Sequence, residues 1–259
     1  MDCVIAAGGH PQPDDLLYPY TQGKSKAQLD MNGRTMLERV IDALQGSQHI
    51  EDIVVVGLGD DQGMSFQRPV HHLPDQGRLI SNGMAGLDWI MEHKGGKPHV
   101  LFSSADIPVI TAAIVDDFIE RCQPLNHILY YNFVTQEAME TRFPHSNRTF
   151  VKLKGARVAG GDMLILRADL AYTHRDLFEA LANGRKHAWQ LAKVVGFGFL
   201  FKFLIRQVGF AEIETVGNRI LGEPTKIIVN PHAEIAMDAD KPHQVDLLRA
   251  DIATHIGIN

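Results

Sequence analysis

The fold of this chain is decided near its start by one stretch, Cys3-Val4-Ile5-Ala6-Ala7-Gly8-Gly9-His10-Pro11. Its apolar opening is typical of a buried strand in a parallel sheet, and the paired glycine ends that strand abruptly. Glycines at the carboxyl end of a strand let backbone N–H groups approach an anion closely, and open parallel sheets bind ligands at that edge. The stretch therefore predicts a first strand that leads into an anion-binding loop, although a Gly-Gly pair alone is also an ordinary strand end.

The sequence beyond this loop makes the prediction more specific. It reads Gly23-Lys24-Ser25-Lys26-Ala27-Gln28-Leu29-Asp30-Met31-Asn32-Gly33-Arg34-Thr35-Met36-Leu37-Glu38, and its two lysines add mobile positive charge suited to phosphates. An apolar strand, a paired glycine, a basic loop and then Lys-x-x-Leu-x-x-x-Gly-x-x-Met-Leu resemble the opening of the MobA-like nucleotidyltransferases. The resemblance covers residues 1–120 well and is thinner over residues 148–250.

The loop departs from that family's pattern at one point. Family members usually carry Gly-x-Gly-x-Arg here, whereas this chain has Gly9-His10-Pro11-Gln12-Pro13 and a longer insertion before Lys24. No arginine precedes Arg34 in the chain. The role of the family's loop arginine is therefore either unfilled or taken by Lys24.

Composition bounds the class of protein. The 259 residues carry a net charge of −6, whereas a general nucleic-acid binder normally has a basic face, so we expect no nucleic-acid partner. The two cysteines, Cys3 and Cys122, have no metal-ligand spacing, and a buried free thiol at Cys3 fits a reducing compartment. Because the chain opens directly on a strand, with no room for a signal peptide, we expect a cytoplasmic protein.

Apolar, β-branched runs alternate with helical patterns in the first half of the chain, and this alternation predicts an α/β fold with a mostly parallel sheet between helices. The second half is less regular. The resemblance implies a Rossmann-like three-layer sandwich of the GT-A-like nucleotidyltransferase type. The expected strands are residues 3–7, 52–58, 100–104, 128–133, 148–153, 163–166, 226–230 and 234–237, and the expected helices are residues 36–44, 79–93, one after Thr111 and several within 169–222, with a polar loop at 137–147.

The resemblance also implies the organisation of the chain. We expect one nucleotidyltransferase domain over residues 1–259, with a nucleotide-binding half at 1–120. The acceptor-side half would then be residues 121–259, with a helical insertion at about 169–222.

Asp106 is the second informative position. The run Leu101-Phe102-Ser103-Ser104-Ala105-Asp106-Ile107-Pro108 delivers a carboxylate at the end of an apolar strand, just before a proline that enforces a turn. A carboxylate placed there can hold Mg²⁺, which takes oxygen ligands and usually shares its shell with substrate phosphates. Asp and Pro are also common turn residues. The run resembles the metal-binding Asp-x-Pro of the same family, which implies a metal-binding and catalytic role for Asp106.

A late acidic motif supplies a second metal candidate. Met237-Asp238-Ala239-Asp240-Lys241-Pro242 looks like the family's late Asp-x-Asp-x-Pro followed by a helix. The resemblance puts Asp240 at the position of a second metal-binding carboxylate, with Asp238 as the alternative. A plain helix cap is the competing interpretation, because Asp is favoured there. The family's acidic pair is replaced here by His243 and Gln244.

Two further regions are assigned by the resemblance. Asn82 would hydrogen-bond a nucleobase edge and Gly77 would permit close approach, although an ordinary loop that caps a helix would look the same. A polar loop with arginines would suit a phosphorylated acceptor. The expected nucleotide-binding residues are Ala6, Ala7, Gly8, Gly9, Lys24, Lys26, Asp75, Gly77 and Asn82, and the expected acceptor-binding residues are Arg142, Arg148, Gly161 and Asp162.

An aromatic segment, residues 186–206, lies outside these motifs. Its uncharged run is far shorter than the ~20 residues that span a bilayer, so we do not expect membrane association. Glycines weaken a continuous helix, so we expect two helical pieces broken near Gly196–Gly198. They would form an apolar wall beside the acceptor or a homodimer contact.

The resemblance implies a Mg²⁺-dependent nucleotidyltransferase. It would transfer a nucleoside monophosphate from a nucleoside triphosphate to a phosphorylated small-molecule acceptor and release pyrophosphate, with Lys26 neutralising charge and Asp106 and Asp240 holding the metal. Two alternatives stay open. A nucleotide-sugar-dependent glycosyltransferase would usually show Asp-x-Asp where this chain has Ser104-Ala105-Asp106, and the missing loop arginine is compatible with a non-catalytic nucleotide-binding protein.

Overall fold

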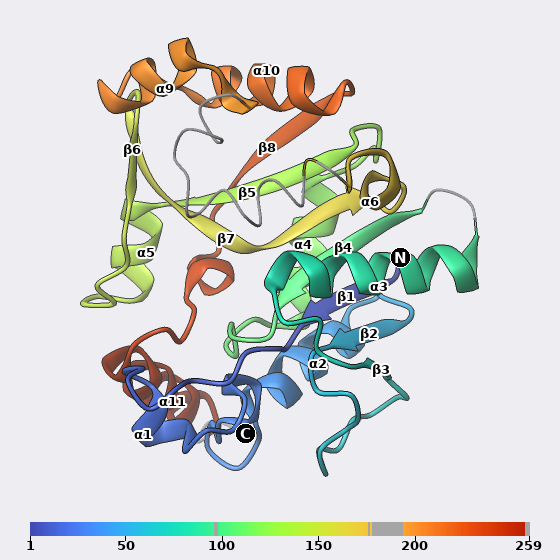
Figure 1. The fold of residues 1–259 in the computed structure, drawn as a ribbon. Coiled ribbons are helices and arrows are strands. Elements are labelled where there is room, and N and C mark those ends of the chain that lie inside the picture. Colours follow the sequence, from blue (N-terminus) through green and yellow to red (C-terminus); the bar gives the residue numbers. More distant parts are fainter. Residues whose placement is uncertain (96–97, 176, 178–193, 257–259) are drawn as a thin grey trace.

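A single twisted sheet organises the chain. The computed structural model describes residues 1–95, 98–175, 177 and 194–256. Within this part, seven strands lie in the order β3-β2-β1-β4-β7-β5-β8, and β6 pairs with β7 (Figure 1). The strands are β1 Cys3–Ala6, β2 Ile53–Val56, β3 His71–Leu73, β4 His99–Ser104, β5 Leu129–Thr135, β6 Val151–Leu153, β7 Ala156–Arg167 and β8 Thr225–Asn230.

The sheet is mostly parallel, as predicted. β1 lies between β2 and β4 and is parallel to both, β2 is parallel to β3, and β5 is parallel to β8. β7 runs antiparallel between β4 and β5 and joins the two parallel groups. The carboxyl ends of β1 and β4 therefore reach the same edge of the sheet.

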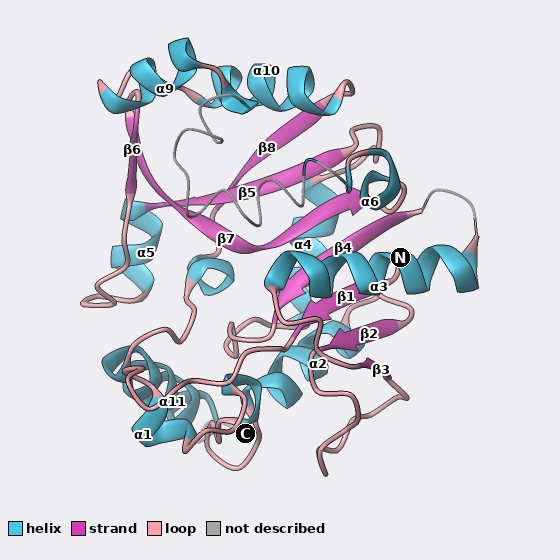
Figure 2. Ribbon diagram, in the orientation of Figure 1, coloured by secondary structure: helices cyan, strands magenta, loops and turns pink. Residues whose placement is uncertain are grey.

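Helices cover both faces of the sheet (Figure 2). Their bounds, which include two short 3₁₀ turns, are α1 Tyr18–Thr21, η1 Lys26–Gln28, α2 Met36–Gly46, α3 Leu79–Lys94, α4 Ala112–Arg121, α5 Gln136–Arg142, α6 Leu170–Thr173, α9 Phe197–Leu204, α10 Phe210–Leu221, η2 Ala233–Ala236 and α11 Pro242–Ile256.

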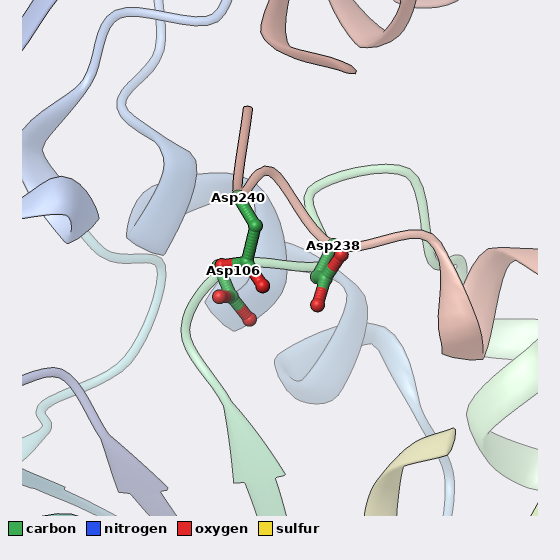
Figure 3. Close-up of side chains that lie close together, drawn as sticks. All are labelled: Asp106, Asp238 and Asp240. Atoms are coloured by element: carbon green, nitrogen blue, oxygen red, sulfur yellow. The ribbon is translucent and has the colours of Figure 1, made fainter. Parts of the chain in front are cut away.

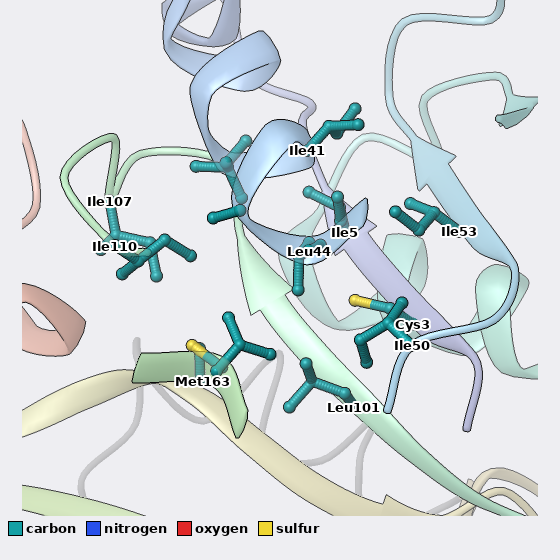
Figure 4. Close-up of a cluster of buried hydrophobic side chains, with 14 of the residues drawn as sticks. Cys3, Ile5, Ile41, Leu44, Ile50, Ile53, Leu101, Ile107, Ile110 and Met163 are labelled. Atoms are coloured by element: carbon teal, nitrogen blue, oxygen red, sulfur yellow. The ribbon is translucent and has the colours of Figure 1, made fainter. Parts of the chain in front are cut away.

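The alternation of side chains along β1 divides the core. Cys3 and Ile5 pack with α2 and α4, while Val4 packs on the other face with α3, because successive strand residues point to opposite faces. Figure 4 shows the first of these clusters between α2 and the strands. All four β1 residues are buried, and burying an aliphatic side chain of this kind contributes about 1.5–3 kcal/mol.

Several predicted elements differ from the structure. The predicted polar loop at 137–147 contains α5, whose N-cap Thr135 accepts a hydrogen bond from the Ala138 N–H. The predicted strand at 234–237 is a 3₁₀ turn, η2. The predicted strand at 163–166 is the end of the twelve-residue β7, and the predicted strand at 148–153 is reduced to β6. β3 was not predicted, because it consists of His71, His72 and Leu73 at the sheet edge.

The aromatic segment is interrupted where the glycines predicted. Val194 and Val195 are helical, Gly196 has a φ of 90°, and α9 then begins at Phe197 and includes Gly198. The part of the prediction that concerns residues 186–193 lies outside the described residues. Among the described residues, no helix has the length and apolar character needed to cross a membrane.

Candidate active site

The candidate site lies where β1 and β4 end side by side. Ala6 and Ser104 are paired across the two parallel strands, so the loops that follow them leave the sheet together. The β1 loop carries the paired glycine, and the β4 loop carries Asp106. This edge of a parallel sheet is the usual place for ligands.

The glycine loop is packed tightly from two sides. A Cβ on Gly57 would lie 2.1 Å from the Gly8 nitrogen, and one on Gly8 would lie 2.5 Å from side-chain atoms of Asp75 and Asn82. Asn82 donates to Asp75 Oδ1 (2.8 Å) and accepts from the Gln76 N–H (2.6 Å). Glycine is therefore required at these positions by the closeness of the neighbouring loops.

Lys26 connects the β1 side of the site to the acidic groups. Ser25 Oγ donates to the Ala7 carbonyl (3.0 Å), which fixes the start of η1 against the end of β1. Lys26 Nζ then lies 2.5 Å from Asp106 Oδ2 and 2.7 Å from Asp240 Oδ1. Burial disfavours the charged ammonium, but the attraction of both carboxylates outweighs it and raises the pKa of Lys26.

Three carboxylates lie close together here, two of which contact Lys26. One oxygen each from Asp106, Asp238 and Asp240 lies within 4.8 Å of the others, and the side chains point toward one another in Figure 3. The Ala239 N–H donates to the Asp106 carbonyl (3.2 Å), which ties the two loops together. Asp238 is buried, whereas the Asp240 side chain is 57% exposed. Burial would raise the pKa of Asp240, but Lys26 outweighs it and lowers that pKa.

A second ion cluster adjoins the first. Arg148 donates through Nη1 to Asp238, and its Nη2 lies 3.8 Å from Asp162 Oδ2. Arg148 Nε and Asp162 Oδ2 are buried without a hydrogen-bond partner among the described residues. Burial, followed by the negative charges of Asp106 and Asp238, raises the pKa of Asp162 to about 8. Burial raises the pKa of Asp238 to about 6, although Arg148 opposes the shift.

An irregularity in β7 places Asp162 beside the site. The register between β5 and β7 shifts between Tyr131, which faces Leu164, and Phe133, which faces Gly160. Asn132 alone stands opposite the extra residues, and its Nδ2 donates to the Met163 carbonyl. A Cβ on Gly161 would lie 1.7 Å from Asn132 Oδ1, so the glycine makes room for this amide. Bulges of this kind re-aim a side chain near functional sites.

The charges of the site fit a divalent cation. Four carboxylates, Asp106, Asp162, Asp238 and Asp240, face the two cations Lys26 and Arg148. With all of them ionised, two negative charges remain in excess, and one buried carboxylate oxygen, Asp162 Oδ2, has no hydrogen-bond partner in the part of the chain that the structure describes. An all-oxygen set of this kind suits a hard cation such as Mg²⁺.

The family follows from comparison with known proteins. Residues 3–146 match the family described as the MobA-like NTP transferase domain, and this match spans more than half of the 259 residues. The chain belongs to this family. The resemblance found in the sequence is confirmed, and the matched residues include the glycine loop, Lys26 and Asp106.

Relatives extend the likeness beyond that match. A 2-C-methyl-D-erythritol 4-phosphate cytidylyltransferase from Alteromonas mediterranea is 31% identical over 128 residues, which is 41% of this chain and 53% of that protein. The chain thus aligns with about half the length of this relative. A hypothetical transferase from Thermus thermophilus has a TM-score of 0.81 at 30% identity and covers 94% of this chain and 98% of its own.

A more distant structure shares the fold alone. The 2-C-methyl-D-erythritol 4-phosphate cytidylyltransferase from Thermus thermophilus has a TM-score of 0.53 at 15% identity, over 97% of this chain and 98% of its own. The predicted α/β fold of the MobA-like family is therefore confirmed.

The structure brings together some of the predicted site residues. Lys26, Asp106, Arg148, Asp162 and Asp240 form the cluster described above, with Gly161 at the bulge beside it. Ala6 ends β1, and Ala7, Gly8 and Gly9 form the adjoining loop. The Asp75–Asn82 pair packs against this loop beside Gly77.

Two predicted residues lie elsewhere. Arg142 donates to Glu234 (2.7 Å) and Asp251 (2.6 Å) and so joins α5 to η2 and α11. Because its guanidinium is already paired with these two carboxylates, we do not include Arg142 among the residues proposed to bind the acceptor substrate. Lys24 is exposed and lines a separate hollow with Tyr20 and Arg249.

Sequence reasoning missed Asn132 and left Asp238 as an alternative. Asn132 is a polar residue in a strand of aromatic and aliphatic residues, Leu129–Thr135, and it is fully buried. An unexplained polar residue at a core position was the available signal, because buried amides need hydrogen-bond partners.

Proposed function

We propose that this chain is a metal-dependent nucleotidyltransferase that transfers a nucleoside monophosphate from a nucleoside triphosphate to a phosphorylated acceptor. The observation that carries the proposal is the meeting of Lys26 with Asp106 and Asp240, at the sheet edge where the glycine loop begins. Membership in the MobA-like NTP transferase domain family supports it. We also propose that both halves of the chain act as one domain, because a single sheet joins them.

The proposed reaction needs positioning and charge neutralisation more than covalent chemistry by the protein. An oxygen of the acceptor phosphate attacks the α-phosphorus, the bond from this phosphorus to its bridging oxygen breaks, and pyrophosphate leaves with that electron pair. Backbone N–H groups after Gly8 hold the triphosphate. Asp106, Asp238 and Asp240 would hold Mg²⁺, which supplies Lewis-acid stabilisation of phosphate charge.

Lys26 has two roles in this proposal. In the free protein its ammonium balances Asp106 and Asp240 at 2.5 and 2.7 Å. Its flexible stem lets the same ammonium turn toward triphosphate oxygens, where a mobile point charge is effective.

Arg148 and Asp162 are the groups that we propose for the acceptor side. Arg148 is held between Asp238 and Asp162, and its buried Nε has no hydrogen-bond partner within the described residues. A phosphate can accept from this guanidinium, because arginine suits planar, bidentate recognition of oxyanions. The names of the cytidylyltransferase relatives support CTP as the donor, and the acceptor in those names, 2-C-methyl-D-erythritol 4-phosphate, is a polyol phosphate.

Pyrophosphate release tests the proposal. The protein is incubated with CTP, GTP, ATP or UTP, Mg²⁺ and a panel of sugar and polyol phosphates, with and without EDTA. We expect acceptor-dependent pyrophosphate release that EDTA abolishes and that Asp106→Asn lowers at least a hundredfold while the melting temperature is retained. Binding of a triphosphate without turnover for any acceptor would favour the non-catalytic alternative, and full activity of Asp106→Asn would overturn the assignment of the site.

A further inference from the structure

Helix α9 exposes an unusual amount of apolar surface. Nine large hydrophobic side chains are exposed among the described residues, and five of them lie in residues 197–205. Phe201 is 63% exposed, Leu204 is 72% exposed and Ile205 is 50% exposed. Contiguous apolar surface of this kind marks an interaction site, whereas single exposed hydrophobic residues need no explanation.

The helix is nevertheless anchored to the protein. Phe199 packs with Phe210 and Val208 in the cluster that covers β6 and the start of β7. The Lys154 N–H donates to the Val208 carbonyl (2.8 Å), which ties the β6–β7 hairpin to the segment after α9. In Figure 1 the hairpin, α9 and α10 lie together at one end of the molecule. The exposed side chains therefore project from a supported helix.

The segment that contains α9 and the β6–β7 hairpin carry a charge opposite in sign to that of the whole chain. Residues 150–158 and 194–210 contain five Lys or Arg residues and no Asp or Glu, although the net charge of the chain is −6. All five side chains are exposed. One of them, Lys202, forms an ion pair with Glu212, with 3.0 Å between Nζ and Oε1. The cations are Lys152, Lys154, Arg157, Lys202 and Arg206.

We propose that α9 and the β6–β7 hairpin form a docking surface for an anionic lipid bilayer. Phe201 and Leu204 would enter the boundary between headgroups and acyl chains, and the cations would lie at the level of the lipid phosphates. The aromatic run is too short to span a bilayer, but a helix that lies on the membrane needs no span. This proposal rests on the surface alone and is independent of the proposed reaction.

A second copy of this chain fits the surface less well. A two-fold dimer places the same patch against itself, so the cations of one copy would face those of the other. Like charges across an interface disfavour association. The negative headgroups of a bilayer are complementary to the same cations. The charge pattern therefore selects the membrane over the homodimer that the sequence left open.

Sedimentation with vesicles tests the proposal. The full chain is mixed with vesicles of phosphatidylcholine or of phosphatidylcholine with phosphatidylglycerol. We expect binding to the anionic vesicles that weakens as salt is raised, and much weaker binding to the neutral ones. The double variant Phe201→Ser/Leu204→Ser should bind the anionic vesicles at least about tenfold more weakly, because two apolar side chains no longer insert.

Matched variants make the result interpretable. Leu16→Ser removes another side chain that is 66% exposed. Leu16 comes just before α1, which lies at the opposite end of the molecule from α9 in Figure 1, so this variant should bind like the wild type. Lys154→Glu/Arg157→Glu should abolish the preference for anionic vesicles, with melting curves that confirm folding. The proposal is overturned if no variant changes sedimentation, if neutral vesicles bind equally well, or if Phe201→Ser dissolves a dimer of a protein that binds no vesicles.

Discussion

At the scale of single residues, Lys26 occupies the place between two carboxylates that a divalent cation would also favour. Its ammonium contacts both Asp106 and Asp240, and together these charges hold a loop at residue 26 against loops far away in the sequence. The free protein is thereby preorganised, since carboxylates that would otherwise repel one another are already neutralised.

Lys26→Ala should lower kcat/KM for the triphosphate by about 10- to 150-fold, the equivalent of the ~1.5–3 kcal/mol of one charge-assisted hydrogen bond. Lys24→Ala is the matched control, because Lys24 is exposed in the separate hollow, and it should stay near wild-type activity. Steady-state kinetics with varied triphosphate measure both. If Lys24→Ala is impaired and Lys26→Ala is not, the extended loop has moved the phosphate contact to Lys24.

Asn132→Ala should cost about 1–3 kcal/mol of stability, because the buried Met163 carbonyl loses its donor, and it should also raise KM for the acceptor. The second effect arises because the bulge that aims Asp162 loses its support. Asn230→Ala is the control, since Asn230 is also buried and its side chain accepts from the nearby His232 N–H. A stability loss with unchanged acceptor KM in both variants would contradict a positioning role for Asn132.

At the scale of elements, a capping box starts α2 and joins it to the loop between β2 and β3. Glu38 accepts from the Thr35 N–H (2.7 Å) and from the Ser65 N–H (2.9 Å), while Thr35 Oγ1 accepts from the Glu38 N–H (3.2 Å). Burial opposes ionisation of Glu38, but these hydrogen bonds outweigh it and lower its pKa. The carboxylate therefore stabilises the folded protein when it is ionised.

This shift predicts a pH dependence of stability. Because the pKa of Glu38 is lower in the folded than in the unfolded chain, its contribution is complete above the unfolded value of about 4.3 and is lost as pH falls through the folded value. Glu38→Gln should lower the melting temperature at neutral pH, consistent with about 1 kcal/mol for a lost cap. The difference from wild type should shrink as the pH approaches about 3, and a constant difference would contradict this role.

At the scale of the whole molecule, the sequence predicted those parts of the fold in which an apolar run marks a buried strand. The apolar runs that became β1, β2 and β4 were predicted, because residue type and order sufficed for them. Lys26 and Asp106 were expected from the family resemblance, and the structure brings their side chains together. Asp162 was expected from the family, but its place depends on a register shift that no local pattern reveals. Arg142 and Arg148 lie close together in the sequence but differ in their ion-pair partners. Arg142 pairs with carboxylates of η2 and α11, whereas Arg148 pairs with Asp238 in the site, and the sequence alone does not reveal these partners.

The antiparallel strand β7 has a consequence for how the chain is made. Leu101 of β4 pairs with Cys3 of β1 on one side and with Ile165 of β7 on the other. A ribosome must therefore release at least 165 residues before β7 can pair with β4 at this position. Until then an apolar strand edge is open, and open edges of this kind recruit other chains. A chain that ends at residue 127 should therefore aggregate by light scattering where the full chain stays dispersed, and a stable monomer of that length would show that the nucleotide-binding half folds before its neighbour is synthesised.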